Sequence, residues 1–196
     1  MHAILDAGLV AHVAVVDAEQ PFVLPVAYAR DRERVLLHGS TGSRLFRALA
    51  GGAPMCLTVT LLDGLILART AFESSMRYRS AMVVGRAQAL DGDDAEVALQ
   101  RLTERLTPGR WEQLRPPSRK ELAATTVVSM SLDEWSVKVS AGDPEDAEED
   151  LAWPVWAGVV PIEHRWGEPV PSADLRGSYP PPRYVGGALG SDEPGS

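Results

Sequence analysis

The sequence predicts a mainly β fold (α+β class), a six- to eight-stranded antiparallel barrel with short peripheral helices. Runs rich in valine and leucine recur along the chain, and Gly, Pro or Asp separates most of them. Few stretches, all of them short, place apolar residues at helical spacing. Closure into a barrel removes exposed strand edges, which suits a small protein with mostly antiparallel strands.

The first three strands are expected at residues 8–17, 22–29 and 34–38. The first run alternates weakly but is rich in valine, and a polar turn follows each of the first two runs. Pro25 lies inside the second run and gives up a hydrogen-bond donor. That strand should therefore be at an edge, be bulged, or be open to a ligand at Pro25.

A loop of small residues follows the third strand. Positions 39–43 read Gly-Ser-Thr-Gly-Ser, and Ser43 is a good N-cap for a helix. Leu45 and Leu49 have helical spacing, and Gly51 ends the pattern. We expect a short helix directly after the loop.

Two further runs, residues 55–62 and 65–70, flank Asp63-Gly64. An Asp-Gly pair between two β-rich runs is a strong hairpin signal, so we predict a two-residue turn there. Residues 80–90 read as another strand, in which Gly85 indicates a bulge or a close backbone approach.

The second half of the chain alternates between helix and strand signals. Apolar residues at helical spacing predict a helix at 95–106. Ser118 is expected to cap a short helix that runs to Ala124. Two strands are expected at 125–132 and 135–140.

The domain organisation follows from composition. Residues 1–168 hold the predicted elements and form one domain, whereas residues 169–196 are rich in Pro, Gly and Ser and predict an extended or disordered tail. Most of the net charge of −8 comes from residues 143–150, which hold six acids. This acidic segment is interpreted as a solvated loop.

Composition also argues against several function classes. The sequence has no basic block, so we expect no nucleic-acid partner. Cys56 is the single cysteine and is interpreted as a buried, inert thiol. No secretory signal and no apolar run of spanning length are apparent, so we expect a soluble cytoplasmic protein with no membrane partner.

The first candidate site is the loop at residues 38–44. A helix start presents unpaired N–H groups, and Ser40 and Ser43 add hydroxyl donors. Arg44 adds a guanidinium that suits a phosphate. The alternative is an ordinary strand-to-helix loop that Ser43 caps, and the residues alone favour neither interpretation.

The second candidate is a cluster of arginines at residues 69–80. Arg69, Arg77 and Arg79 lie near Tyr78 and several serines, and arginines beside aromatic rings suit a planar anion. In the alternative interpretation, these arginines face solvent or pair with the acidic segment.

Other chemistry receives less support from the residues. The four histidines have no metal-like spacing, and His12 is interpreted as a structural histidine within a strand. The sequence has no Gly-x-Ser-x-Gly motif of the hydrolase type, and no pair of carboxylates stands out as general acid and base.

The ordered set of motifs is more specific than any one of them. The chain resembles the pyridoxamine 5′-phosphate oxidase-like flavoproteins over roughly residues 9–161, especially the flavin-nucleotide-binding or nitroimidazole-resistance-like branch. The resemblance rests on 20–26 (QPFVLPV), 36–44 (LLHGSTGSR), 63–69 (DGLILAR), 78–87 (YRSAMVVGRA) and 154–161 (PVWAGVVP).

The resemblance implies a split β-barrel, a homodimer, and FMN bound at the subunit interface. It places the FMN phosphate on the loop and helix start and the flavin ring beside the second strand. It also places the flavin or its ribityl chain beside Arg79 and Ser80, at the start of the strand expected at 80–90. The residues that this implies are Pro25, Val26, Ala27, His38, Gly39, Ser40, Ser43, Arg44, Arg79 and Ser80.

Two departures from the family pattern bear on function. Leu45 occupies a position that is often basic in true pyridoxamine-phosphate oxidases, so Arg69 or Arg47 would have to assist Arg44. The C-terminal motif that binds the substrate phosphate has no counterpart around His164 and Arg165.

The leading hypothesis is therefore an FMN-dependent oxidoreductase that acts on a small molecule of unidentified class. Alternatives are a flavin-binding module without turnover, the same barrel holding a deazaflavin or haem, and a structural barrel with an empty site.

Overall fold

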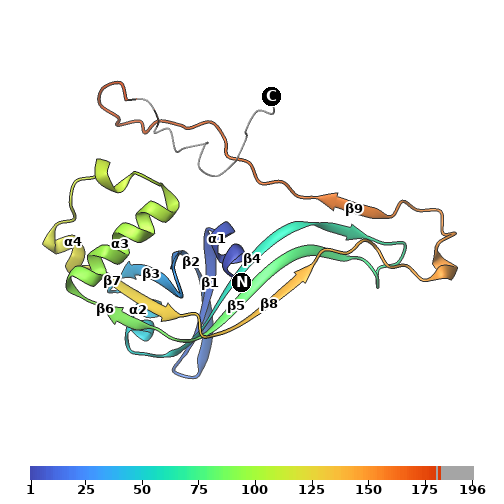
Figure 1. Cartoon of the computed structure of the whole chain (residues 1–196), viewed down its shortest axis with the longest axis horizontal. Coiled ribbons are helices and arrows are strands. Elements are labelled where there is room, and N and C mark those ends of the chain that lie inside the picture. Colours follow the sequence, from blue (N-terminus) through green and yellow to red (C-terminus); the bar gives the residue numbers. More distant parts are fainter. Residues whose placement is uncertain (180, 182–196) are drawn as a thin grey trace.

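A computed structural model describes residues 1–179 and 181. In this part of the chain, one sheet of nine strands curls into a half-open barrel, with the order β6-β7-β3-β2-β1-β4-β5-β8 and with β9 paired to β4 (Figure 1). Every strand pair is antiparallel, as predicted. The strands are β1 (Val10–Asp17), β2 (Gln20–Asp31), β3 (Arg34–Ser40), β4 (Pro54–Leu67), β5 (Ser75–Arg86), β6 (Gln88–Leu90), β7 (Thr125–Ser131), β8 (Glu134–Ser140) and β9 (Gly158–Pro161).

Most of the helices lie at one end of the sheet, and the long strands β4 and β5, with the shorter β8 beside β5, extend away from them (Figure 1). The helices are α1 (His2–Ala7), α2 (Arg44–Ala50), α3 (Gly92–Leu106) and α4 (Arg119–Ala123), with single turns η1 (Trp111–Gln113) and η2 (Glu148–Asp150). The predicted helices are confirmed. Helix α4 begins with a complete capping box between Ser118 and Glu121.

The main core lies inside the curled sheet. Alternate residues of β1, such as Val13, face inward together with Leu57 and Val59 of β4, all fully buried. Helix α1, which the sequence did not signal, closes this core with Leu5, whose carbonyl accepts a 2.6 Å hydrogen bond from buried Tyr28. A second apolar cluster lies under α3.

The predicted turn at Asp63-Gly64 is wrong. Strand β4 runs through both residues, with a register irregularity between Leu62 and Gly64. Strand β9 pairs there, and a Cβ on Gly64 would lie 2.8 Å from the Val160 carbonyl oxygen. The glycine therefore serves close strand contact, and the actual turn lies at residues 68–74.

Pro25 and Gly85 meet their predicted roles in part. Pro25 pairs with His12 of β1, but β2 pairs with β3 only from Tyr28 onward, so one side of the strand is open at Pro25. Gly85 causes no register shift. Instead, a Cβ there would lie 3.4 Å from the Met130 sulfur, which agrees with close approach rather than a bulge.

The region after β9 has neither helix nor strand in its described part, residues 162–179 and 181. It runs back from β9 toward the helical end of the molecule (Figure 1). The rest of the predicted tail, 182–196 and residue 180, lies outside the described residues. Across the described residues, every helix is too short or too polar to cross a membrane.

Candidate cofactor site

The loop between β3 and α2 is closed by its own hydrogen bonds. The Ser43 amide donates to the Ser40 carbonyl at 2.9 Å, and the Gly42 amide donates to the Ser40 hydroxyl at 3.1 Å. Arg47 donates from Nη1 to the Gly42 carbonyl at 3.0 Å. These bonds fix the loop shape, so that its remaining donors point in fixed directions.

Gly39 lies near the end of β3, where it pairs with Thr126, and Phe46 of α2 lies directly against it. A Cβ on Gly39 would lie 2.2 Å from the ring of Phe46, which is itself buried. Ser43 occupies the N-cap position, but its hydroxyl makes no capping hydrogen bond. That hydroxyl is therefore available to a ligand, together with the first amides of α2.

Arg44 is held by the β1–β2 hairpin. Its Nε donates to an Asp17 carboxylate oxygen at 2.6 Å and Nη2 donates to the Asp17 carbonyl at 3.0 Å. The guanidinium also lies over the Phe22 ring. Half of the Arg44 side chain is still exposed, so Nη1 can reach an anion in solvent.

His38 lies on the strand just before the loop, and it is partly exposed. Desolvation by the surrounding atoms lowers the pKa of His38 below its ordinary value. The imidazole is therefore neutral at pH 7, and it can act as donor and acceptor but not as a phosphate countercharge.

The sheet register separates the predicted ring-contacting residues. Paired residues of an antiparallel sheet place their side chains on the same face. Pro25 pairs with His12, and Ala27 pairs with Val10, whereas Val26 pairs with Ala11 of the core. Pro25 and Ala27 therefore share the outer face, and Val26 points inward.

The same rule separates Ser80 from Arg79. Ser80 pairs with Thr60 and Lys138 on the outer face, whereas Arg79 pairs with Leu61 on the other face. Arg79 forms a two-bond ion pair with Asp63, at 2.6 and 2.8 Å. This hydrogen bonding also lowers the pKa of Asp63. Ser80 thus joins Pro25 and Ala27, and Arg79 does not.

We call this outer surface the open face. Its members were not predicted as a group, because strand alternation alone does not say which face is covered. It comprises Val10, His12 and Ala14 of β1; Val23, Pro25 and Ala27 of β2; Cys56, Thr58 and Thr60 of β4; Ser80, Met82 and Val84 of β5; and Ser136 and Lys138 of β8.

Two sequence interpretations change on this face. His12 is exposed rather than structural. Among the described residues, His2 is the histidine whose ring has a hydrogen-bonded partner. Cys56 is half-buried rather than buried, with its sulfur 3.8 Å from the Thr58 hydroxyl. Neither residue faces the core, because each belongs to the outward set of its strand.

Arg69 and Arg77 belong to a different region. Asp146 accepts from the Arg69 amide at 2.7 Å and from Nη1 at 2.9 Å, and its side chain is 1% exposed. Asp143 binds Arg77 at 2.6 Å. The acidic segment is therefore not simply a solvated loop. Arg69 follows β4, and the far end of β4 lies away from α2 (Figure 1).

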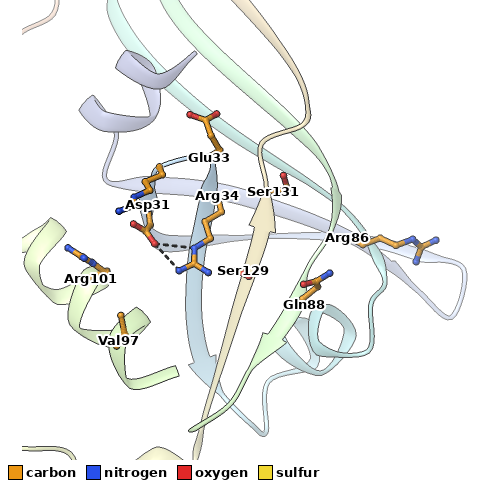
Figure 2. Close-up of a pocket in the computed structure, with 10 residues that line it drawn as sticks. Asp31, Glu33, Arg34, Arg86, Gln88, Val97, Arg101, Ser129 and Ser131 are labelled. Carbon is orange, nitrogen blue, oxygen red and sulfur yellow. Dashed lines mark hydrogen bonds and ion pairs between the residues drawn. The ribbon is translucent and has the colours of Figure 1, made fainter. Parts of the chain in front are cut away.

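Two of the grooves in the described part of the surface are large enough to consider as ligand sites. A polar groove of about 610 Å³ lies between α3 and the β2–β3 turn, where Arg34 pairs with Asp31 (Figure 2). A more apolar groove of about 700 Å³ lies on the open face, and Ala14, Cys56 and Val84 are among its lining residues. The apolar groove lies toward the β1–β2 turn, and neither Pro25 nor Ser80 is among the residues that line it.

The chain is similar to a known protein family and to several solved structures. The family model of pyridoxamine 5′-phosphate oxidase matches residues 1–139. A solved structure described as the FAD and heme binding protein from Mycobacterium smegmatis is 43% identical, with 93% of this chain and 90% of that chain covered and a TM-score of 0.89.

The flavocytochrome Anf3 from Azotobacter vinelandii is also 43% identical, with 94% of this chain and 86% of that chain covered and a TM-score of 0.87. A putative 5-nitroimidazole antibiotic resistance protein from Bacteroides thetaiotaomicron shares the fold at 18% identity, with 69% and 80% covered and a TM-score of 0.57. No curated protein matches the chain. Because the family model matches most of the chain, the chain belongs to the pyridoxamine 5′-phosphate oxidase family.

Proposed function

We propose that this protein binds a flavin nucleotide and haem and works as an electron-transferring oxidoreductase. The observation that supports this proposal most directly is 43% identity to two proteins, over at least 86% of each chain. They are described as an FAD and heme binding protein and a flavocytochrome. Neither cofactor would be expected from the fold alone, because one fold hosts many functions.

The flavin would occupy the loop and the adjoining open face. The Ser43 hydroxyl, the first amides of α2 and Arg44 suit the phosphate, and Pro25, Ala27 and Ser80 form a surface for the ring. This residue set fits a flavin because it combines an anion site with an apolar platform. Arg47 shapes the loop, and it compensates for the missing basic residue at Leu45.

We expect FAD rather than FMN, following the Mycobacterium smegmatis protein. FAD contains the whole of FMN, so the loop that suits the FMN phosphate also suits the matching phosphate of FAD. The adenylate half would extend beyond the loop. The bound flavin itself supplies hydride and electron transfer, and the protein orients it and shields one side.

The open face supports a homodimer with the flavin at its interface. Val10, Val23 and Met82 are each more than two-fifths exposed on this face. Exposed apolar patches of this kind mark interaction surfaces. A second copy would cover the flavin ring and complete the site, and light scattering of the purified protein measures the expected dimer mass.

The test is the absorbance spectrum of the purified full chain, followed by chromatography of the flavin released on heating. We expect flavin absorbance bands and a haem Soret band in the spectrum of the protein, and FAD in the extract. Bleaching of the flavin by a nicotinamide cofactor, with electrons passed to haem, would support the redox role. A colourless protein that takes up neither added flavin nor haem would overturn the proposal. A deazaflavin in the extract would overturn its flavin part.

A further inference from the structure

The polar groove between α3 and the β2–β3 turn holds more positive than negative charge (Figure 2). Four arginines and two acids are among its lining residues, a net charge of +2, whereas the whole chain has a net charge of −8. A concave, net-positive surface on an acidic protein attracts an anion. The charged lining residues are Asp31, Arg32, Glu33, Arg34, Arg86 and Arg101.

The floor of the groove is polar because the character of one face of the sheet changes along β7. Val127 is buried on this face under α3, whereas Ser129 and Ser131 follow on the same face and line the groove. Ser129 pairs with Gln88 of β6, and Ser131 pairs with Arg34 of β3, so all four side chains share this face. The helix thus covers the apolar part of the face and leaves the polar part open to a ligand.

Arg34 lies in the middle of the groove with part of its guanidinium unused (Figure 2). Its Nε and Nη2 donate to one Asp31 carboxylate oxygen at 3.1 and 2.8 Å, and no described residue accepts a hydrogen bond from Nη1. The ion pair orients the guanidinium, so Nη1 has a fixed direction before a ligand binds. The second Asp31 oxygen can accept a hydrogen bond from a ligand hydroxyl.

Two of the charged lining residues do not direct their charge into the groove. Glu33 is hydrogen bonded to His2 at 3.2 Å, and its carboxylate points away from Arg34 (Figure 2). Arg86 donates to a backbone carbonyl between α2 and β4, and its guanidinium also points away from Arg34 (Figure 2). Three arginines and Asp31 remain, which again gives a net charge of +2.

Arg32 and Arg101 are exposed, and neither forms an ion pair with a described residue. Arg32 also has a φ of 56°, a left-handed conformation that glycine or asparagine adopts at lower cost. An arginine at such a position indicates a role for its side chain, since the backbone alone would favour another residue.

The lining residues also select the class of anion. Val97 is the single apolar residue among the described residues that line the groove, so a large aromatic or aliphatic group would gain little there. Ser129, Ser131 and Gln88 instead offer hydroxyl and amide groups to a hydroxyl-rich ligand. A phosphate monoester carries about −1.5 to −2 charges at pH 7, which matches the charge of the lining.

We propose that the polar groove binds a sugar phosphate. The arginines hold the phosphate, and the polar floor and the second Asp31 oxygen bind the sugar hydroxyls. The groove volume of about 610 Å³ lies within the range of small-molecule sites. Arg34 begins β3, and the phosphate loop follows the other end of this strand, about 20 Å away at the usual rise per residue. The site is therefore separate from the flavin loop, and the proposal does not depend on the proposed function.

The test is calorimetric titration of the full-length protein, with flavin added beforehand, using ribose 5-phosphate, ribose and inorganic phosphate. We expect ribose 5-phosphate to bind at least about tenfold more tightly than inorganic phosphate, because the hydroxyls add hydrogen bonds. Ribose should give no measurable heat, and added salt should weaken ribose 5-phosphate binding. Equal affinity for inorganic phosphate, or no binding of ribose 5-phosphate at millimolar concentration, would overturn the proposal.

The variants locate the binding. Arg101→Gln should weaken ribose 5-phosphate binding at least about tenfold, because it removes a charge-assisted hydrogen bond. Arg119→Gln is the matched control, since Arg119 is also exposed and helical but does not line the groove. Arg32→Gly should weaken binding while its thermal unfolding temperature stays at or above that of the wild type, because glycine accommodates the positive φ. A loss of binding in Arg32→Gly therefore cannot come from misfolding.

Arg44→Ala separates the groove from the flavin loop, and we expect it to bind ribose 5-phosphate as the wild type does. Loss of binding in Arg44→Ala but not in Arg101→Gln, or release of flavin by ribose 5-phosphate, would place the ester at the loop and overturn the proposal. A protein that takes up no flavin but binds ribose 5-phosphate through Arg101 would contradict the proposed function and support this site.

Discussion

The guanidinium of Arg44 lies 4.6 Å from the centroid of the Phe22 ring. The guanidinium stacks on the Phe22 ring and also forms an ion pair with Asp17. These two contacts orient the arginine before any ligand binds. An arginine that is already oriented loses less conformational entropy when it binds a phosphate. The β1–β2 hairpin therefore contributes to the candidate site without contacting the ligand itself.

Arg44→Ala should weaken flavin binding about 10- to 100-fold, because a hydrogen bond to a charged group contributes about 1.5–3 kcal/mol. Arg44→Lys should recover only part of this, since a lysine ammonium lacks the planar fork. Fluorescence titration of the apoprotein with flavin measures both effects. Arg115→Ala, which removes an exposed arginine paired with Glu121, is the matched control. Equal flavin affinity in Arg44→Ala and the control would refute the phosphate role.

Gly39→Ala should destabilise the fold by about 1–3 kcal/mol, the usual cost of overpacking. The added Cβ would lie 2.2 Å from the Phe46 ring, which is buried and cannot move away freely. Urea unfolding measures the change in the free energy of unfolding. Gly42→Ala is the control, since the nearest atom to its Cβ would be the Ser40 hydroxyl oxygen at 3.5 Å. Comparable stability of the two variants would show that Phe46 does not restrict Gly39.

Much of the fold was accessible from the sequence, because strand and helix signals are local. The loop at residues 38–44 and the helix after it depend on small residues and caps that act within a few positions. The Asp63-Gly64 turn failed because a distant strand, β9, pairs along Gly64 and keeps β4 extended. A contact that is made nearly a hundred residues later leaves no local signal.

The candidate site was accessible only in part. Alternation along β2 already implies that Pro25 and Val26 face opposite sides, but it does not say which side is covered. The partners of Arg69 and Arg79 come from chain folding rather than from spacing, and the acids that bind them were read as solvent-facing or as part of a turn. The position of His12 on an exposed face became clear only once that face was assembled from five strands.

Asp146→Asn should lower the free energy of unfolding by about 1–3 kcal/mol, the cost of leaving a buried charged partner poorly satisfied. The Asp146 side chain is 1% exposed and accepts two hydrogen bonds from Arg69, whose Nε is already buried without a partner. Asp143→Asn should cost less than about 1 kcal/mol, because the Asp143 side chain is 83% exposed. Thermal or urea unfolding compares the two. A larger loss for Asp143→Asn would contradict the view that Asp146 anchors the acidic segment.

His38 should make stability fall as the pH drops through the acidic range. Its pKa in the folded protein is lowered from 6.5 by desolvation, so the unfolded chain binds a proton more readily than the folded chain. The stabilisation is complete above pH 6.5 and is lost as the pH falls toward the lower folded-state pKa. Asp6 and Asp63, whose pKa values are lowered from 3.8, contribute stability that is lost as the pH falls below that value.

The measurement is urea unfolding of the wild type and His38→Gln at several pH values from neutral to mildly acidic. Glutamine keeps a polar side chain but does not titrate, so the variant should show a flatter dependence as the pH falls below 6.5. His164→Gln, which replaces an exposed histidine outside the sheet, should keep the wild-type slope. If His38→Gln and the wild type lose stability in parallel, the desolvated imidazole is not the group that titrates. Because bound flavin would stabilise the folded state by itself, the comparison is made on the apoprotein.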